Sequence, residues 1–99
     1  MFARVTTMKG SPNNVDDGIR EFKNQPQRYG RQDGFIGKYL LVDRTSGEMI
    51  SITLWETEGH LQATAATASQ QRQRNVQAAA AAPPSVAIYE VAFHPPEMA

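Results

Sequence analysis

The sequence predicts an α+β domain in which a four-stranded antiparallel sheet carries two helices on one face. The first observation is the order of strand-like and helix-like segments along the chain, which is β-α-β-β-α-β. The second is that only a short glycine-containing turn separates the middle two strands, which indicates a hairpin. The third is the length of 99 residues, so we expect residues 1–99 to form a single domain.

The first strand is predicted at Phe2–Lys9, where aromatic and β-branched residues favour a pleated backbone. Turn-forming residues follow and lead into a helix over Pro12–Gln25, whose apolar residues recur at helical spacing. Pro26 ends that helix, because proline cannot donate the next backbone hydrogen bond. The polar, glycine-punctuated segment Gln27–Gly34 is predicted to be a loop.

The hairpin is predicted to join a strand at Phe35–Asp43 to a strand at Glu48–Glu56, with Gly47 at positive φ in the turn. Strict alternation sorts the first strand into two apolar faces: Ile36, Leu40 and Val42 on one, Phe35, Tyr39 and Leu41 on the other. The return strand sorts in the same way: Met49, Ser51, Thr53 and Trp55 on one face, Ile50, Ile52 and Leu54 on the other.

A second helix is predicted at Glu58–Ala82, with Thr57 as its N-cap and Pro83 as its stop. Its inward side is expected to carry Leu61, Ala65, Ala68 and Val76. The last strand is predicted at Ser85–Phe93, with Ala87, Tyr89, Val91 and Phe93 alternating along one face.

This element order is the ferredoxin-like, or split βαβ, arrangement. Two helices cannot cover both faces of a sheet, yet the strand at Phe35–Asp43 is apolar on both. We therefore expect a homodimer in which the bare sheet faces pack against each other.

Composition argues against several classes of function. Lys plus Arg and Asp plus Glu both total 10, and no basic stripe is present, so a nucleic-acid partner is not expected. No apolar run approaches the roughly 18 residues of a membrane helix, and the N-terminus lacks a signal-peptide core, so a cytoplasmic protein is expected. The absence of cysteine and the wide separation of His60 from His94 leave no metal-ligand pattern. Nucleotide-binding and nucleophile-elbow motifs are likewise missing from the sequence.

The stretch GFIGKYLLVDRTSGEMISITLWETEGHL, residues 34–61, resembles the central hairpin and helix start of the dimeric α+β barrel superfamily. It is most similar to the antibiotic-biosynthesis-monooxygenase-like branch. The resemblance implies a dimeric α+β barrel with a pocket between sheet and helices, Trp55 at its rim and His60 at the start of the second helix.

Members of that superfamily include cofactor-independent monooxygenases that oxidise polycyclic phenols or anthrones with O₂, haem-degrading enzymes and isomerases. The resemblance thus implies a monooxygenase-like enzyme for an aromatic small molecule, with no cofactor. A non-catalytic dimeric module that binds a hydrophobic ligand or a protein partner is the alternative. Haem degradation fits less well, because the first strand lacks the Asn of those relatives and Trp55 and His60 stand closer together.

Five residues are candidates for the site. His60 is the catalytic candidate, because a histidine pKa near neutrality suits proton transfer with a phenol. Trp55, Tyr39, Thr53 and Arg4 are candidate substrate-binding residues, as a stacking wall, two hydroxyl groups and an anion-orienting guanidinium. Each has a plain structural alternative: a core tryptophan, an exposed helix-end histidine, a half-buried strand tyrosine, an interface threonine and a surface arginine.

Overall fold

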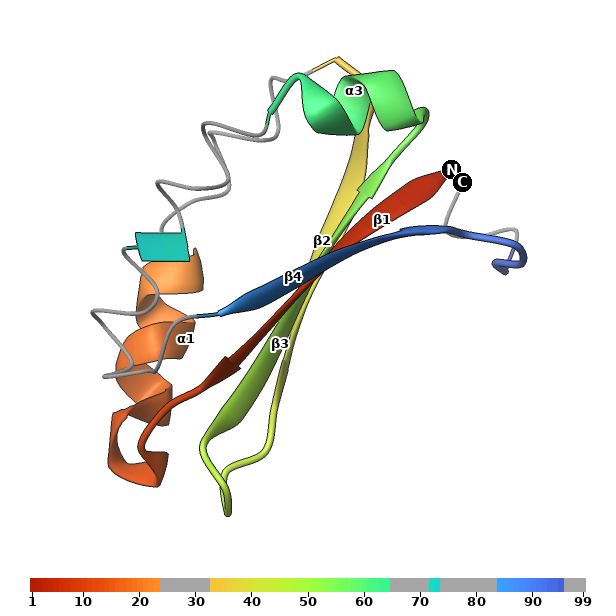
Figure 1. Cartoon of the computed structure of the whole chain (residues 1–99). Coiled ribbons are helices and arrows are strands. Elements are labelled where there is room, and N and C mark those ends of the chain that lie inside the picture. Colours follow the sequence, from red (N-terminus) through yellow and green to blue (C-terminus); the bar gives the residue numbers. More distant parts are fainter. Residues whose placement is uncertain (24–32, 65–71, 74–83, 96–99) are drawn as a thin grey trace.

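The described part of the chain has the predicted α+β architecture. A computed structural model describes residues 1–23, 33–64, 72–73 and 84–95. Its labelled elements are β1 (Phe2–Lys9), α1 (Val15–Lys23), β2 (Phe35–Val42), β3 (Glu48–Trp55), α3 (Glu58–Gln62) and β4 (Ser85–Glu90). The strands form one sheet in the order β2-β3-β1-β4, with every neighbouring pair antiparallel. Helices α1 and α3 lie on the same side of this sheet (Figure 1), so the ferredoxin-like fold is confirmed.

Helix α1 begins slightly later than predicted, because Pro12–Asn14 form a separate 3₁₀ turn before Val15. The Ser11 hydroxyl caps that turn by accepting a hydrogen bond from one of its backbone N–H groups. The helix is described as far as Lys23, and the predicted end at Gln25 lies outside the described residues.

Helix α3 begins as predicted, with the Thr57 hydroxyl accepting a hydrogen bond from the backbone N–H of His60 (3.1 Å). Leu61 faces inward and is completely buried. Most of the predicted continuation to Ala82, including Ala65, Ala68 and Val76, lies outside the described residues. Among the residues that the structure describes, no helix has the length and apolar character needed to cross a membrane.

The strand register assigns each residue to one face of the sheet. The side that faces the helices carries alternate residues of the three strands: Phe2, Arg4, Thr6, Met8, Lys38, Leu40, Val42, Met49, Ser51, Thr53 and Trp55. The predicted grouping of the β3 residues is confirmed by this register. The prediction that Phe35 lies on the face opposite Leu40 is wrong, because a bulge between Phe35 and Gly37 brings Phe35 opposite Trp55. One extra residue reverses the alternation of faces along a strand.

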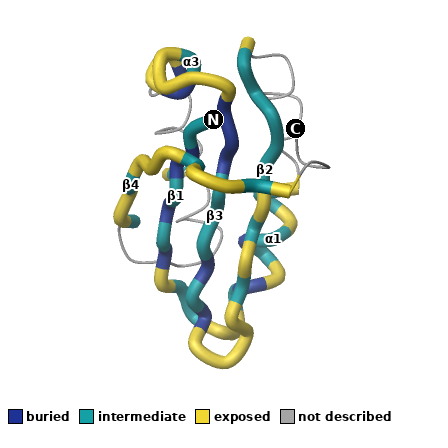
Figure 2. Tube along the Cα trace, turned by 90° about the vertical axis from the view of Figure 1, so that its right-hand side faces the viewer, coloured by how far each residue is buried: buried dark blue, intermediate teal, exposed yellow. Residues whose placement is uncertain are grey.

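Two buried hydrophobic clusters lie between the helices and the sheet. Near the hairpin turn, Met8 and Met49 pack with Leu40 and Val42. At the other end of the sheet, Trp55 and Leu61 pack with Phe2 and Phe35. Buried positions follow the central strands β1 and β3, whereas β4 is mostly exposed (Figure 2).

The opposite face of the sheet has no helix over it among the described elements, and it exposes large apolar side chains. Tyr39 is 46% exposed, Leu41 50% and Tyr89 57%. Strand β4 ends at Glu90 rather than at the predicted Phe93, because Glu90 already pairs with Phe2 at the start of β1. The apolar character of this face, predicted from the sequence, is therefore present in the fold.

The β2–β3 turn depends on two residues, Asp43 and Gly47. Gly47 has φ of +83°, which confirms the predicted positive value, and its carbonyl accepts a hydrogen bond from Gly10 N (3.0 Å). The Asp43 carboxylate accepts hydrogen bonds from the backbone N–H groups of Thr45 (2.9 Å) and Ser46 (3.3 Å). These bonds favour the charged form, so the pKa of Asp43 is lowered.

Candidate functional site

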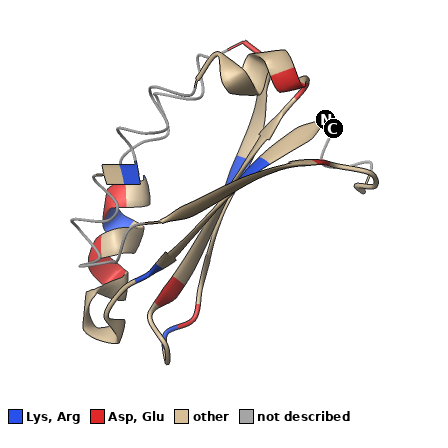
Figure 3. Ribbon diagram, viewed as in Figure 1, with Lys and Arg blue, Asp and Glu red and all other residues tan. Residues whose placement is uncertain are grey.

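A strip of polar side chains crosses the helix-facing side of the sheet between the two hydrophobic clusters. Lys38 of β2, Thr53 of β3 and Arg4 of β1 occupy one row, because Thr53 pairs with both of its neighbours. Thr6 and Ser51 form a pair in the next row. Arg4, Thr6 and Thr53 are buried, and basic residues lie near the middle of the sheet in Figure 3. Hydroxyl and cationic groups are thus brought together on the helix-facing side of the sheet.

Arg4 connects the sheet to helix α3. One of its guanidinium nitrogens donates hydrogen bonds to the Leu61 carbonyl (2.8 Å) and to the Thr64 hydroxyl (3.2 Å). The Thr64 hydroxyl in turn donates to the same Leu61 carbonyl (2.8 Å). A cation is favourable at the carbonyl end of a helix, so these contacts hold α3 on the sheet. Arg4 is only 5% exposed and is therefore not a surface residue.

Trp55 lies within the hydrophobic core, with no exposed surface. Its indole N–H donates to the Thr53 hydroxyl (3.0 Å). Its ring meets that of Phe35 edge to face, with 5.3 Å between centroids. These contacts are those of a core aromatic residue. The indole N–H has a hydrogen-bond acceptor, which is the Thr53 hydroxyl.

His60 lies in the first turn of α3, where its contacts are local. Its Nδ1 atom is 2.8 Å from the Thr57 hydroxyl, the same group that caps the helix. The imidazole packs directly against Gly34, which has φ of +79°, and a Cβ atom at Gly34 would overlap the ring. Glycine at this position therefore allows the close approach of the ring.

The predicted site residues do not form one cluster: three share a face of the sheet, Tyr39 lies on the other face, and His60 lies at the start of α3. Arg4, Thr53 and Trp55 share the helix-facing side and are linked through Thr53 by strand pairing and a hydrogen bond. Tyr39 pairs with Ile52 on the opposite, exposed face, and the structure does not bring it to the others. Within the described ranges, His, Cys, Asp and Glu side chains form no group of three or more that could hold a metal ion.

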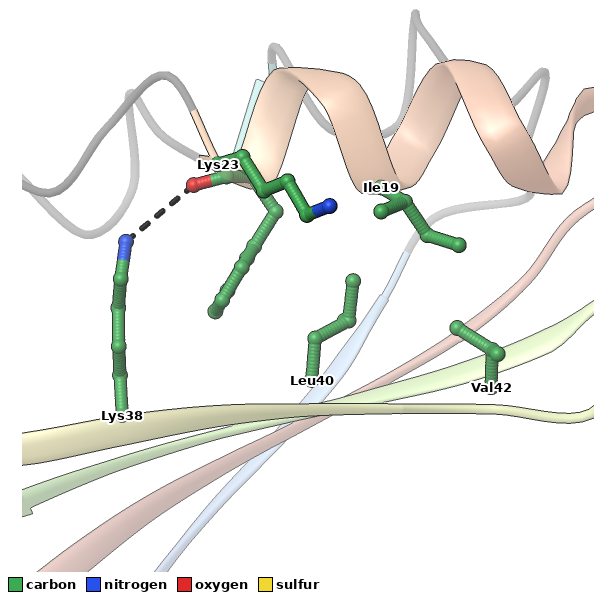
Figure 4. Close-up of a pocket in the computed structure, with 6 residues that line it drawn as sticks. Ile19, Lys23, Lys38, Leu40 and Val42 are labelled. Carbon is green, nitrogen blue, oxygen red and sulfur yellow. Dashed lines mark hydrogen bonds between the residues drawn. The ribbon is translucent and has the colours of Figure 1, made fainter.

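A cavity of about 410 Å³ opens between α1 and β2, beside the polar strip. The described residues that line it come from these two elements: Ile19, Phe22, Lys23, Lys38, Leu40 and Val42. Leu40 and Val42 rise from the strand toward Ile19 on the helix, and Lys38 rises toward the end of the helix at Lys23 (Figure 4). The Lys38 ammonium donates to the Phe22 carbonyl (3.2 Å), and its burial lowers its pKa.

The resemblance implied a pocket between sheet and helices, but none of the predicted site residues lines this cavity, and Lys38 was not predicted to do so. Lys38 is the only charged residue in Phe35–Val42, and it alternates in step with Leu40 and Val42. A lone lysine among apolar residues on an inward strand face marks a buried polar environment. The sequence alone does not show that α1 packs against that face of the strand; this contact is a property of the tertiary fold.

Comparison with known proteins gives sequence relatives of part of the chain. No family model matches the sequence. Two uncharacterised proteins of Mycobacterium tuberculosis are similar: Rv2558 is 40% identical over 58 residues, which are 58% of this chain and 25% of that protein. Rv2557 is 41% identical over 59 residues, or 58% of this chain and 26% of that protein. The chain matches about a quarter of the length of these curated relatives.

Solved structures resemble the chain over nearly its whole length. A putative antibiotic biosynthesis monooxygenase from Deinococcus radiodurans has a TM-score of 0.73 at 14% identity and 95% coverage of both chains. The chain has the fold of the antibiotic-biosynthesis-monooxygenase-like proteins. MhuD, a haem degrader from Mycobacterium tuberculosis, has a TM-score of 0.75 at 16% identity, covering 95% of this chain and 98% of its own. SnoaB, a cofactor-independent oxygenase from Streptomyces nogalater, has a TM-score of 0.69 at 15% identity and 96% coverage of both.

The monooxygenase-like fold agrees with the resemblance found in residues 34–61, and that prediction is confirmed. Identities of 14–16% carry the fold alone. The haem degrader and the cofactor-independent oxygenase share the fold, so the activity has to be argued from this chain's own residues.

Proposed function

We propose that this protein is a monooxygenase-like enzyme that holds an aromatic or polycyclic small molecule in the cavity between α1 and the sheet. The observation that supports this proposal is the cavity itself. Its volume of about 410 Å³ lies within the range of small-molecule sites, roughly 300–1,000 Å³. Ile19, Phe22, Leu40 and Val42 offer apolar walls for a ring system, and the lysines offer polar contacts.

The chemistry proposed for this site requires no bound cofactor. A ring methylene, as in an anthrone, reacts with O₂ to give a ring carbonyl and water, and the substrate supplies all the electrons. The enzyme's task is then to position the substrate and to favour loss of its proton. SnoaB, a cofactor-independent oxygenase, shares the fold, so this reaction class is compatible with the fold.

Turnover of an anthrone in air tests the proposal, with O₂ uptake and quinone absorbance as readouts. Val42→Trp should fill the cavity and abolish binding and turnover. Val86→Trp is the matched control, because Val86 is also on an edge strand but does not line the cavity. Binding without turnover would favour the non-catalytic binding module, and the absence of both would refute the proposal. A parallel titration with haem tests the remaining chemistry of this fold.

The catalytic role of His60 stays a prediction. His60 is absent from the cavity lining, and its contacts with Thr57 and Gly34 are those of a helix start. If His60 transfers the substrate proton, His60→Ala lowers anthrone turnover while the melting temperature changes little. Unchanged turnover in that variant would leave His60 a capping residue.

We propose in addition that two copies associate through the bare sheet faces. The proposal is supported by the exposed apolar side chains of that face, Tyr39, Leu41 and Tyr89. Light scattering after size exclusion at micromolar concentration should give a dimer. Tyr89→Asp should shift it toward monomer, whereas Val86→Asp, on the other face of β4, should not. A wild-type monomer would refute this assembly.

A further inference from the structure

Two lysine side chains border the cavity between α1 and β2. Lys38 comes from the strand and its side chain reaches up to the end of the helix, whereas Lys23 is the last described residue of the helix itself (Figure 4). The other described residues of the lining are apolar. An apolar space bordered by two cations is complementary to a ligand with an apolar body and a negative group.

The surroundings of Lys38 disfavour the charged form of its side chain. Its ammonium lies 4.4 Å from the centre of the Phe22 ring and donates one hydrogen bond, to the Phe22 carbonyl. An ammonium has three N–H donors, so it can make further bonds without losing this one. The ion pairs of the described residues join Arg20 to Asp17 and Arg44 to Asp16, and neither includes Lys38. A half-buried cation that has no carboxylate partner among the described residues gains from an anionic ligand.

We propose that the cavity binds an aromatic small molecule as its anion, with a negatively charged oxygen of the ligand paired to the Lys38 ammonium. The ring system lies between Phe22 and Ile19 on the helix side and Leu40 and Val42 on the strand side. Lys23 adds a second positive charge at the more exposed wall. The inference rests on the proposed function and specifies its substrate class as phenolates or enolates; an aromatic carboxylate is an unreactive anionic probe of the same site. Lys38 positions the ligand and stabilises the anion from which electrons pass to O₂.

Two isosteric probes separate charge recognition from simple filling of the cavity. Naphthoate is anionic at neutral pH, and naphthamide has nearly the same shape without the charge. Calorimetric titration should show naphthoate binding about tenfold tighter, in line with a charge-assisted hydrogen bond. Lys38→Met should reduce the affinity for naphthoate to that for naphthamide and leave naphthamide unchanged. Lys38→Arg should restore most of the preference.

Lys9→Met is the control for loss of a positive charge, because Lys9 is exposed on β1 and outside the cavity lining. It should keep the preference for naphthoate. Equal affinities of the wild type for both probes would overturn the charge inference while the cavity proposal stands. An unchanged preference in folded Lys38→Met would overturn the assignment to Lys38. Failure of both probes and of anthrone to bind would instead refute the proposed function.

Discussion

Replacement of Trp55 by phenylalanine tests whether this residue serves primarily as a core aromatic. The side chain is completely buried against Leu61, Phe2 and Phe35, so loss of part of the indole should cost about 1–2 kcal/mol of burial. The variant also removes the N–H donor to the buried Thr53 hydroxyl, which adds about 1 kcal/mol. The unfolding free energy should therefore fall by about 2–3 kcal/mol. For a domain of this size, that corresponds to roughly 10–20 °C in melting temperature.

Circular dichroism melts at one fixed protein concentration measure this loss, since association would make the melting temperature depend on concentration. Thr53→Val isolates the hydrogen bond and should account for about 1 kcal/mol of the effect. Phe93→Leu is a matched control, because Phe93 is 87% exposed and its truncation should change stability by less than about 0.5 kcal/mol. A Trp55→Phe protein that melts at the wild-type temperature would refute the core assignment. If its stability were unchanged and its anthrone affinity reduced, Trp55 would be a pocket wall.

Three further predictions concern single positions. Gly47→Val should lower the unfolding free energy by more than about 1 kcal/mol, because φ is +83° and a Cβ atom would strike the Gly10 backbone; an unchanged melting temperature would contradict this. Gly34→Ala should lower the unfolding free energy by about 1–2 kcal/mol, because φ is positive there, and it should displace the His60 ring. Gly37→Ala is the control and should cost much less, because the space around Gly37 is open. Equal melting temperatures of the two variants would contradict the requirement for glycine at position 34. Because the Lys38 pKa is lowered in the folded state, the unfolded chain binds more protons between that lowered pKa and the ordinary value of 10.5. The stability of wild type relative to Lys38→Met should therefore rise with pH across this window, and denaturant titrations showing a flat or falling difference would contradict it.

The sequence by itself determined the elements and most of their faces. The bounds of β1 agree with the prediction, and those of β2 and β3 agree to within one residue, because β-branched and aromatic alternation dominates local backbone preference there. Gly47 was predictable because a tight hairpin turn requires positive φ at that position. The N-cap at Thr57 was predictable because a hydroxyl before a helix satisfies an N–H group that the helix leaves open.

The tertiary structure decided which elements pack against those faces. The bulge that moves Phe35 beside Trp55 depends on pairing with β3, so alternation along β2 alone could not reveal it. The sequence left Trp55 either at a pocket rim, as the resemblance implies, or in the core, and its complete burial against Leu61 became visible only in the tertiary structure. In the sequence, Lys38 is one charged residue in an otherwise apolar strand. Only the packing of α1 over that face of the sheet places Lys38 in a cavity. The physical reason is that periodicity specifies which way a side chain points, whereas burial, electrostatic cost and available volume depend on the element that lies opposite.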